Sequence, residues 1–101
     1  MSVTLPRETL EYLAFPITTS PVDAASLSHQ VAIIDEFAHP VSGDWFAGTY
    51  TNAEVQVLVR ASEDAPAGGD VELAVGRWRV WWRADANPEF PARQVGIVSV
   101  V

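Results

Sequence analysis

The chain has 101 residues, of which 49% are hydrophobic, and its 13 acidic and 6 basic residues give a formal net charge of −7. The length suits one domain, the apolar content excludes a disordered tail, and the acidity argues against direct binding of nucleic acid, whose phosphates need Lys and Arg. Cysteine is absent, which excludes disulfides and thiolate metal sites. No run approaches the ~20 apolar residues of a membrane span. We therefore expect a single domain over residues 1–101 with no membrane partner.

Residues 1–17 predict two strands. The first segment, 1–6, is short and partly apolar, typical of an edge strand or a short amino-terminal arm. After it, alternation gives one face a set of apolar side chains: Leu13, Phe15 and Ile17. A helix over 7–15 that Pro16 would end is the alternative. We favour the strand, which Pro16 confines to a sheet edge or a bulge.

The segment that follows a turn at 20–23 has two interpretations. Helical spacing of apolar residues over 24–37 competes with a period-two alternation of four residues: His29, Val31, Ile33 and Phe37. Three β-branched side chains in the middle of this segment favour a strand over a helix. We expect a strand over 29–37.

Residues 38–70 predict one clear strand between two irregular stretches. The stretch 38–52 contains Pro and Gly residues and indicates a long connection with a short strand around 45–50. Residues 54–60 alternate more cleanly and place three valines on the inward face. The stretch 62–70 is a turn-rich loop.

The carboxyl-terminal part predicts the hairpin around which the fold is organised. A short strand over 71–75 leads into long strands over 77–84 and 93–101, joined by a loop that contains Asn87-Pro88. One face of the first long strand is apolar: Trp78, Val80, Trp82 and Ala84. The other face carries Arg77, Arg79, Trp81 and Arg83. With the earlier segments the chain has about seven short strands, so we expect an all-β, antiparallel β-sandwich.

The residue types that carry chemistry do not form a motif. The two histidines, His29 and His39, match no metal-ligand spacing, and we expect both at surface or turn positions. The adjacent acids at 35–36 and 63–64 point to opposite faces if extended, so neither pair predicts a catalytic dyad. No nucleophile elbow or phosphate loop is present. We expect no enzyme, no catalytic residue, no cofactor and no metal.

The basic face of the 77–84 strand is the strongest candidate for a binding site. Arg77, Arg79 and Arg83 flank Trp81, a combination enriched at protein interfaces. Two alternatives remain open: the arginine stems cover the indole for structural reasons, or the indole is a platform for single-stranded nucleic acid. Trp45 and Phe46 are further candidates for surface anchors, because four tryptophans exceed what one small core can hide.

Two segments resemble small proteins from the structural gene modules of tailed bacteriophages and prophages of actinobacteria. They are Arg7-Glu-Thr-Leu-Glu-Tyr-Leu-Ala-Phe-Pro-Ile, and the closing stretch from Gly76-Arg-Trp-Arg-Val-Trp-Trp-Arg to Gln94-Val-Gly. The resemblance implies a one-domain immunoglobulin-like sandwich whose last two strands are 77–84 and 93–101, with Trp78 where a tyrosine is usual. It implies a part of a virion, assembled in the host cytoplasm, and supplies no catalytic residue.

The sequence therefore leads to one preferred function and several alternatives. The preferred function is a structural virion protein that decorates or cements the capsid by binding the major capsid protein, with self-association in the particle. A head-to-tail connector or a tail-associated protein is the first alternative. A carbohydrate- or peptide-binding module, with Trp81 or Trp45 as its stacking platform, is the second. A small hydrolase is the least supported, since no acid, base and nucleophile are grouped.

Overall fold

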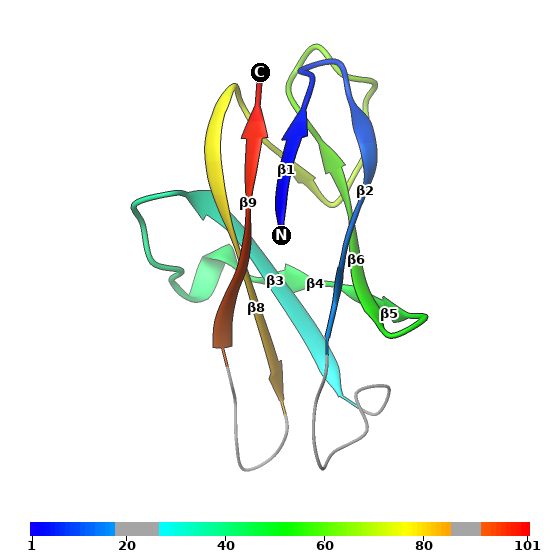
Figure 1. Cartoon of the computed structure of the whole chain (residues 1–101), viewed down its shortest axis with the longest axis vertical. Helices are drawn as coiled ribbons and strands as arrows, with labels where there is room; N and C mark the ends of the chain where they lie inside the picture. Colours follow the sequence, from blue (N-terminus) through cyan, green and yellow to red (C-terminus); the bar gives the residue numbers. More distant parts are fainter. Residues whose placement is uncertain (18–26, 86–91) are drawn as a thin grey trace.

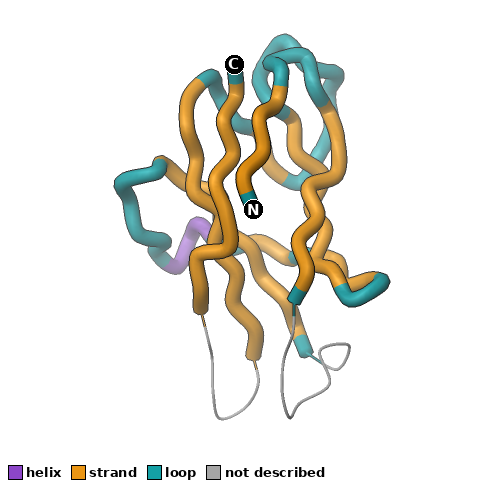
Figure 2. The backbone as a smooth tube through the Cα atoms, viewed as in Figure 1, coloured by secondary structure: helices purple, strands orange, loops and turns teal. Residues whose placement is uncertain are grey.

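The computed structural model describes residues 1–17, 27–85 and 92–101, so the turn expected at 20–23 and the loop at Asn87-Pro88 lie outside the described residues. The described chain is predominantly β, and its strands form two sheets that pack against each other (Figures 1 and 2). A short 3-10 turn, η2 (Ser42–Asp44), lies in the connection that follows one central strand. The expectation of an all-β chain is confirmed.

The larger sheet has five strands and is built on the carboxyl-terminal hairpin. Its strands lie in the order β1 (Ser2–Leu5), β9 (Ala92–Val100), β8 (Gly76–Asp85), β3 (Ser28–Asp35) and β4 (Phe46–Ala47). Neighbouring strands run antiparallel except β1 and β9, which are parallel. The amino-terminal segment is thus a paired edge strand rather than a free arm.

The smaller sheet has four strands. In it β2 (Leu10–Pro16) pairs with β6 (Glu54–Arg60), which also pairs with β5 (Thr49–Thr51) and, in parallel, with β7 (Val71–Glu72). Pro16 ends an edge strand, where its missing N–H costs no ladder bond. The expectation of antiparallel pairing throughout is wrong for β1–β9 and β6–β7, because these partners are joined by crossovers and not by hairpins.

The core lies between the two sheets, where alternation sends one set of side chains from each. Its buried members include Leu5, Leu13, Phe15, Val31, Val55, Val57, Val59, Val80, Trp82, Val98 and Val100. Trp82 is 3% exposed, and its indole N–H donates to Nδ1 of His29 at 3.0 Å, so its polar tip is satisfied inside the core. Trp78, expected on the same face, is half-buried at the margin of the core.

The single strand expected around 45–50 is in fact two strands in different sheets. β4 belongs to the five-stranded sheet and β5 to the smaller one, and Gly48 lies between them. A Cβ atom at Gly48 would lie 2.6 Å from Cγ1 of Val55 and 3.1 Å from Cγ2 of Val31. Only a residue without a side chain fits this crossing between the sheets.

Two strands end earlier than their apolar pattern suggests. β3 ends at Asp35, whose carboxylate accepts the N–H of Phe37 at 3.0 Å and forms a turn that leaves the Phe37 side chain 85% exposed. β7 ends at Glu72, and Val75 is exposed. The strand expected over 29–37 is therefore too long at its carboxyl end, because a local side-chain-to-backbone bond competes with strand continuation.

The turn between β5 and β6 contains a strained alanine. Asn52 and Ala53 have φ angles of 51° and 62°, and Thr51 pairs directly with Glu54. A two-residue hairpin with both φ values positive has the geometry of a type I′ turn. Asn tolerates the left-handed region, whereas the Cβ of Ala53 crowds the following carbonyl.

Gly48→Ala tests the crossing between the sheets. Overpacking of a rigid site costs about 1–3 kcal/mol, so we expect a loss of unfolding free energy of that size. Gly43→Ala is the matched control, because a Cβ there meets no atom within 4 Å. Urea denaturation of both variants measures the difference, and equal stabilities would contradict the crossing.

Ala53→Gly tests the strained turn. Relief of left-handed strain is worth roughly 1–2 kcal/mol, and the added freedom of the unfolded chain takes back about 0.4–1 kcal/mol. We therefore expect a net gain in stability between about 0 and 1.6 kcal/mol, measured by thermal unfolding. Ala47→Gly, an exposed strand position without positive φ, is the control and should lose stability. A loss at Ala53 as well would argue against the turn.

Candidate functional site

The candidate interface residues of β8 lie on the face of the five-stranded sheet that points away from the core. Val80, Trp82 and Ala84 are buried on the inner face. Strand periodicity therefore places Arg77, Arg79, Trp81 and Arg83 on the opposite face, as the sequence predicts. We call this the outer face; its neighbours across the ladder are Gln30, Ala32 and Ile34 of β3.

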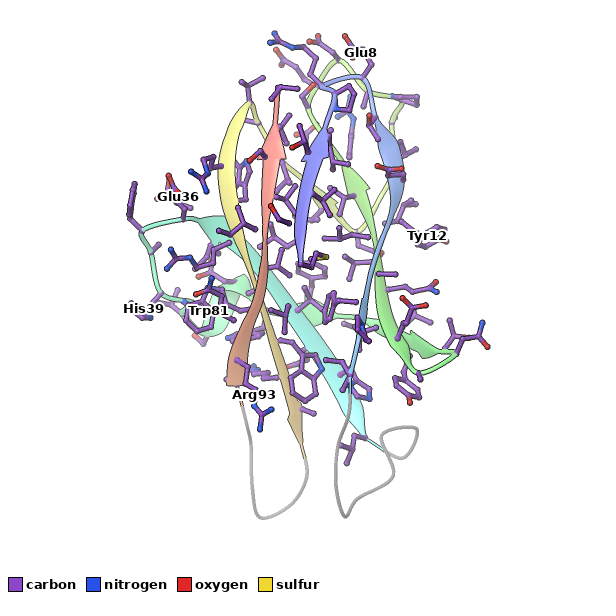
Figure 3. The ribbon with its side chains drawn as sticks, viewed as in Figure 1. Glu8, Tyr12, Glu36, His39, Trp81 and Arg93 are labelled. Carbon is purple, nitrogen blue, oxygen red and sulfur yellow. The ribbon has the colours of Figure 1, made fainter. Side chains whose placement is uncertain are left out.

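Residues 36–45, here the 36–45 loop, fold back along the outer face. The His39 ring lies 5.5 Å from the Trp81 ring, centroid to centroid, and Figure 3 shows the two residues side by side. The Arg83 guanidinium lies 4.3 Å from the centre of the Trp45 ring, in cation–π geometry, and its Nε donates to Oε1 of Gln30 at 2.6 Å. The loop therefore covers part of the face that the sequence predicts to be open.

Part of the outer face is buried, and two hydrogen-bond donors on it have no partner among the described residues. Ala32, the cross-strand neighbour of Trp81, is fully buried although it lies on the outer face. Within the described residues, Nε of Arg79 and Nε1 of Trp81 are buried without a hydrogen-bond partner. Buried donors are rarely left unpaired, so these two atoms mark the outer face as the region where the described residues do not complete the hydrogen bonding.

The 36–45 loop is held in place at both ends. The carboxylate of Asp35 accepts the N–H of Phe37 at 3.0 Å, and that of Asp44 accepts the N–H of Val41 at 2.9 Å. The carboxylate oxygen Oε2 of Glu36 lies 3.4 Å from Nε of Arg77, and this ion pair ties the loop to β8. These bonds order the loop while Phe37 and Val41 remain exposed, at 85% and 66%.

Sequence reasoning missed Phe37 and Val41 as surface anchors. Phe37 continues the period-two alternation of His29, Val31 and Ile33, so the sequence predicts it as the end of a strand and not as an anchor. The signal that could have found it is the acid two residues earlier, because an Asp side chain readily bonds the backbone two residues ahead and starts a turn.

The sequence predicts Trp45 and Phe46 together as surface anchors, but in the structure their side chains lie on opposite sides of the chain. Trp45 lies against Arg83 on the outer face. Phe46 is the cross-strand partner of Val31, and it is half-buried against the core. Adjacent residues of an extended segment point to opposite sides, so both cannot belong to one surface.

The two histidines occupy different environments. His39 is exposed in the 36–45 loop, as expected. His29 is 5% exposed, stacks on Tyr50 at 5.0 Å between ring centroids, and accepts the indole N–H of Trp82. The expectation of a surface position for His29 is wrong, because an aromatic pair and a core donor satisfy the ring. No group of three or more potential metal ligands occurs in the described part of the chain.

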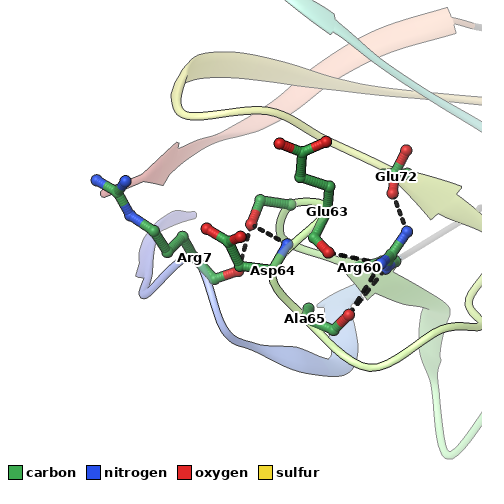
Figure 4. A network of polar contacts seen from close by, with 7 residues as sticks. Arg7, Arg60, Glu63, Asp64, Ala65 and Glu72 are labelled. Atoms are coloured by element: carbon green, nitrogen blue, oxygen red, sulfur yellow. Dashed lines mark hydrogen bonds and ion pairs between the residues drawn. The ribbon is translucent and has the colours of Figure 1, made fainter.

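A second polar cluster lies where the 61–70 connection meets Arg7, beside a pocket of about 360 Å³ (Figure 4). Arg60 donates to the carbonyls of Glu63 and Ala65 and pairs with the carboxylate of Glu72. Ser62 is buried, and its hydroxyl donates to the Arg7 carbonyl at 2.5 Å. These contacts brace the connection and place no histidine base beside the hydroxyl.

Comparison with known proteins adds no assignment. No family model matches the chain, and neither a curated protein nor a solved structure matches it. Among the residues that the structure describes, no helix has the length and apolar character needed to cross a membrane. Function must therefore be inferred from the geometry of the chain itself.

Two single variants, Trp82→Ala and Trp81→Ala, test which face of β8 points toward the core. Loss of the buried Trp82 indole should lower the unfolding free energy by about 3–5 kcal/mol, as expected for aromatic-to-alanine changes in cores. Loss of Trp81, which is partly exposed on the outer face, should cost less than half as much. Denaturant titration of both variants gives the comparison, and equal losses would show that the two faces have been misassigned.

Proposed function

We propose that this chain is a non-enzymatic structural protein of a bacteriophage particle, and that it coats the capsid by binding the major capsid protein. The observation that carries the proposal is the braced 36–45 loop, which holds Phe37 85% exposed beside the Arg–Trp outer face. The resemblance of the two end segments to phage structural proteins supports the same class.

The exposed Phe37 has no function in the fold. It contributes nothing to the core, and an exposed aromatic favours association with other surfaces. Because the loop is ordered by the Asp35 and Asp44 carboxylates, a partner need not supply the free energy of ordering it on binding. Preorganised aromatic anchors with arginine nearby are the usual hot spots of protein interfaces.

The chemistry of the outer face supports a protein partner with acceptor groups. Arg77 keeps 57% of its side chain exposed although it pairs with Glu36, so its guanidinium still has donors that a partner can reach. A sugar or base platform would instead need an open indole face. His39 and Arg83 lie against Trp81 and Trp45, so neither indole is fully open.

An immunoglobulin-like topology is the finer proposal for the sandwich. The five-stranded order β1-β9-β8-β3-β4 beside the order β2-β6-β5 supports this proposal, because variable-type immunoglobulin sandwiches also extend one of their two sheets beyond the constant-type strands. Near the start of β8 the indole N–H of Trp78 donates to the Ala74 carbonyl at 2.9 Å. In an immunoglobulin-like fold this bond would be the counterpart of the tyrosine corner, in which a side chain near the start of the equivalent strand bonds the backbone a few residues upstream.

Phe37→Ser tests the docking surface. Removal of the exposed ring should leave the thermal unfolding midpoint unchanged, because the side chain makes no core contact, and should weaken binding to purified capsids at least about tenfold, as hot-spot truncations do. Val75→Ser is the matched control, since Val75 is an exposed apolar residue that lines the pocket beside Arg7 and Ser62. Binding that survives Phe37→Ser unchanged would remove the loop from the interface.

The virion assignment has its own test. Particles purified on mild gradients and analysed by quantitative mass spectrometry should contain the chain in numbers close to those of the capsid protein. A copy number of about a dozen, as a ring at one vertex would have, would point to the head-to-tail junction instead. Absence of the chain from particles would contradict both assignments.

A further inference from the structure

β2 leaves one side of its backbone without a strand partner among the described residues. It is the edge of the smaller sheet and pairs with β6 alone. The Thr9 carbonyl accepts from the Ala61 N–H at 2.8 Å, and the Ile17 N–H donates to the Ala53 carbonyl at 3.2 Å. These bonds show that the odd-numbered residues of this segment turn their backbone N–H and C=O groups toward β6.

The even-numbered residues therefore turn their backbone groups to the free edge, because N–H and C=O groups in an antiparallel strand alternate sides with every residue. Leu10, Tyr12 and Ala14 each offer a donor and an acceptor there. Pro16 offers only an acceptor. The free edge thus carries three complete pairing positions, centred on Tyr12.

The same three residues share the outer side of the smaller sheet. The cross-strand partner of Tyr12 is Leu58, and the Tyr12 side chain is 66% exposed and points away from the molecule (Figure 3). Leu10 and Ala14 are half-buried beside it. The outer side of the edge is therefore a small apolar surface, and the one charge of β2, Glu11, lies on the opposite side of the strand.

We propose that β2 pairs with β2 of a second copy of this chain, antiparallel and about a two-fold axis at Tyr12. In this register Tyr12 lies opposite Tyr12 of the second copy, and Leu10 lies opposite Ala14. All three complete positions are used and form about six hydrogen bonds between the copies. A register shifted by two residues toward the end of the strand would bring Pro16 into the ladder and lose donors.

The edge is complementary to itself, which favours a second copy over a different extended segment. Glu11 is the one charged residue within β2, and the proposed register sets it opposite Leu13 and not opposite another carboxylate. Like charges directly opposite each other would oppose pairing. The two smaller sheets would then join into one continuous sheet.

Self-pairing of this size is weak in solution. The contact is small, and two chains of net charge −7 repel each other, so added salt should strengthen it by screening. Neighbouring copies on a capsid would reach effective concentrations in the millimolar range, roughly, by tethering. Only the high effective concentration on a capsid rests on the proposed function; the pairing of free chains does not.

A cysteine trap tests the proposal, because the natural chain has no cysteine. Cα atoms of a hydrogen-bonded antiparallel pair lie about 5.5 Å apart, within the range of a disulfide. Under mild oxidation Tyr12→Cys should form covalent dimers at least roughly tenfold faster than the exposed control Val75→Cys, since pairing holds the thiols together. Equal rates, together with monomeric natural chain at about 1 mM in sedimentation, overturn the proposal.

Charge variants test the two-fold register. Tyr12→Glu and Tyr12→Lys each place like charges opposite each other, and each should weaken self-association at least about fivefold. Mixed together, the two variants should pair with each other, because only a residue that faces itself can be rescued in this way. Absence of that rescue overturns the register. Unchanged thermal unfolding of both variants shows that the fold is intact, and particle composition tests the virion assignment separately.

Discussion

The alternation of side chains along β8 is the constraint on which the rest of the structure depends. β8 lies in the middle of the five-stranded sheet, so its inner face has to be apolar, and Val80 and Trp82 supply the centre of the core. The same periodicity then forces three arginines and Trp81 onto the outer face. An indole and its aliphatic neighbours cannot all stay in water without cost, so another segment has to cover part of that face.

The 36–45 loop supplies this cover, and its geometry explains why the molecule exposes an aromatic ring. His39 and Trp45 turn toward β8, and the bonds of the Asp35 and Asp44 carboxylates hold the backbone between them. The turn that the Asp35 carboxylate starts sends the Phe37 side chain outward. Phe37 is therefore exposed as a consequence of covering Trp81, and a surface that can bind a partner arises from the packing of the sheet.

The regular parts of the fold could be predicted from the sequence, and the irregular parts could not. The closing hairpin, the β6 strand over 54–60 and the edge position of β2 follow from period-two patterns and from Pro16. The crossing at Gly48 could not be predicted, because a glycine signals freedom and not the neighbours that demand it. The left-handed Ala53 carries no turn signal at all.

The candidate site could be predicted only in part from the sequence. Periodicity identifies which β8 residues share the outer face, but the cover over them depends on contacts between distant segments, such as those of Arg83 with Trp45 and Gln30.

The most direct test of the packing of the 36–45 loop on the outer face is an NMR study of the free chain. It should show nuclear Overhauser contacts between His39 and Trp81, and backbone order parameters near about 0.85 through the 36–45 loop. Missing contacts with order parameters below about 0.6 would contradict it.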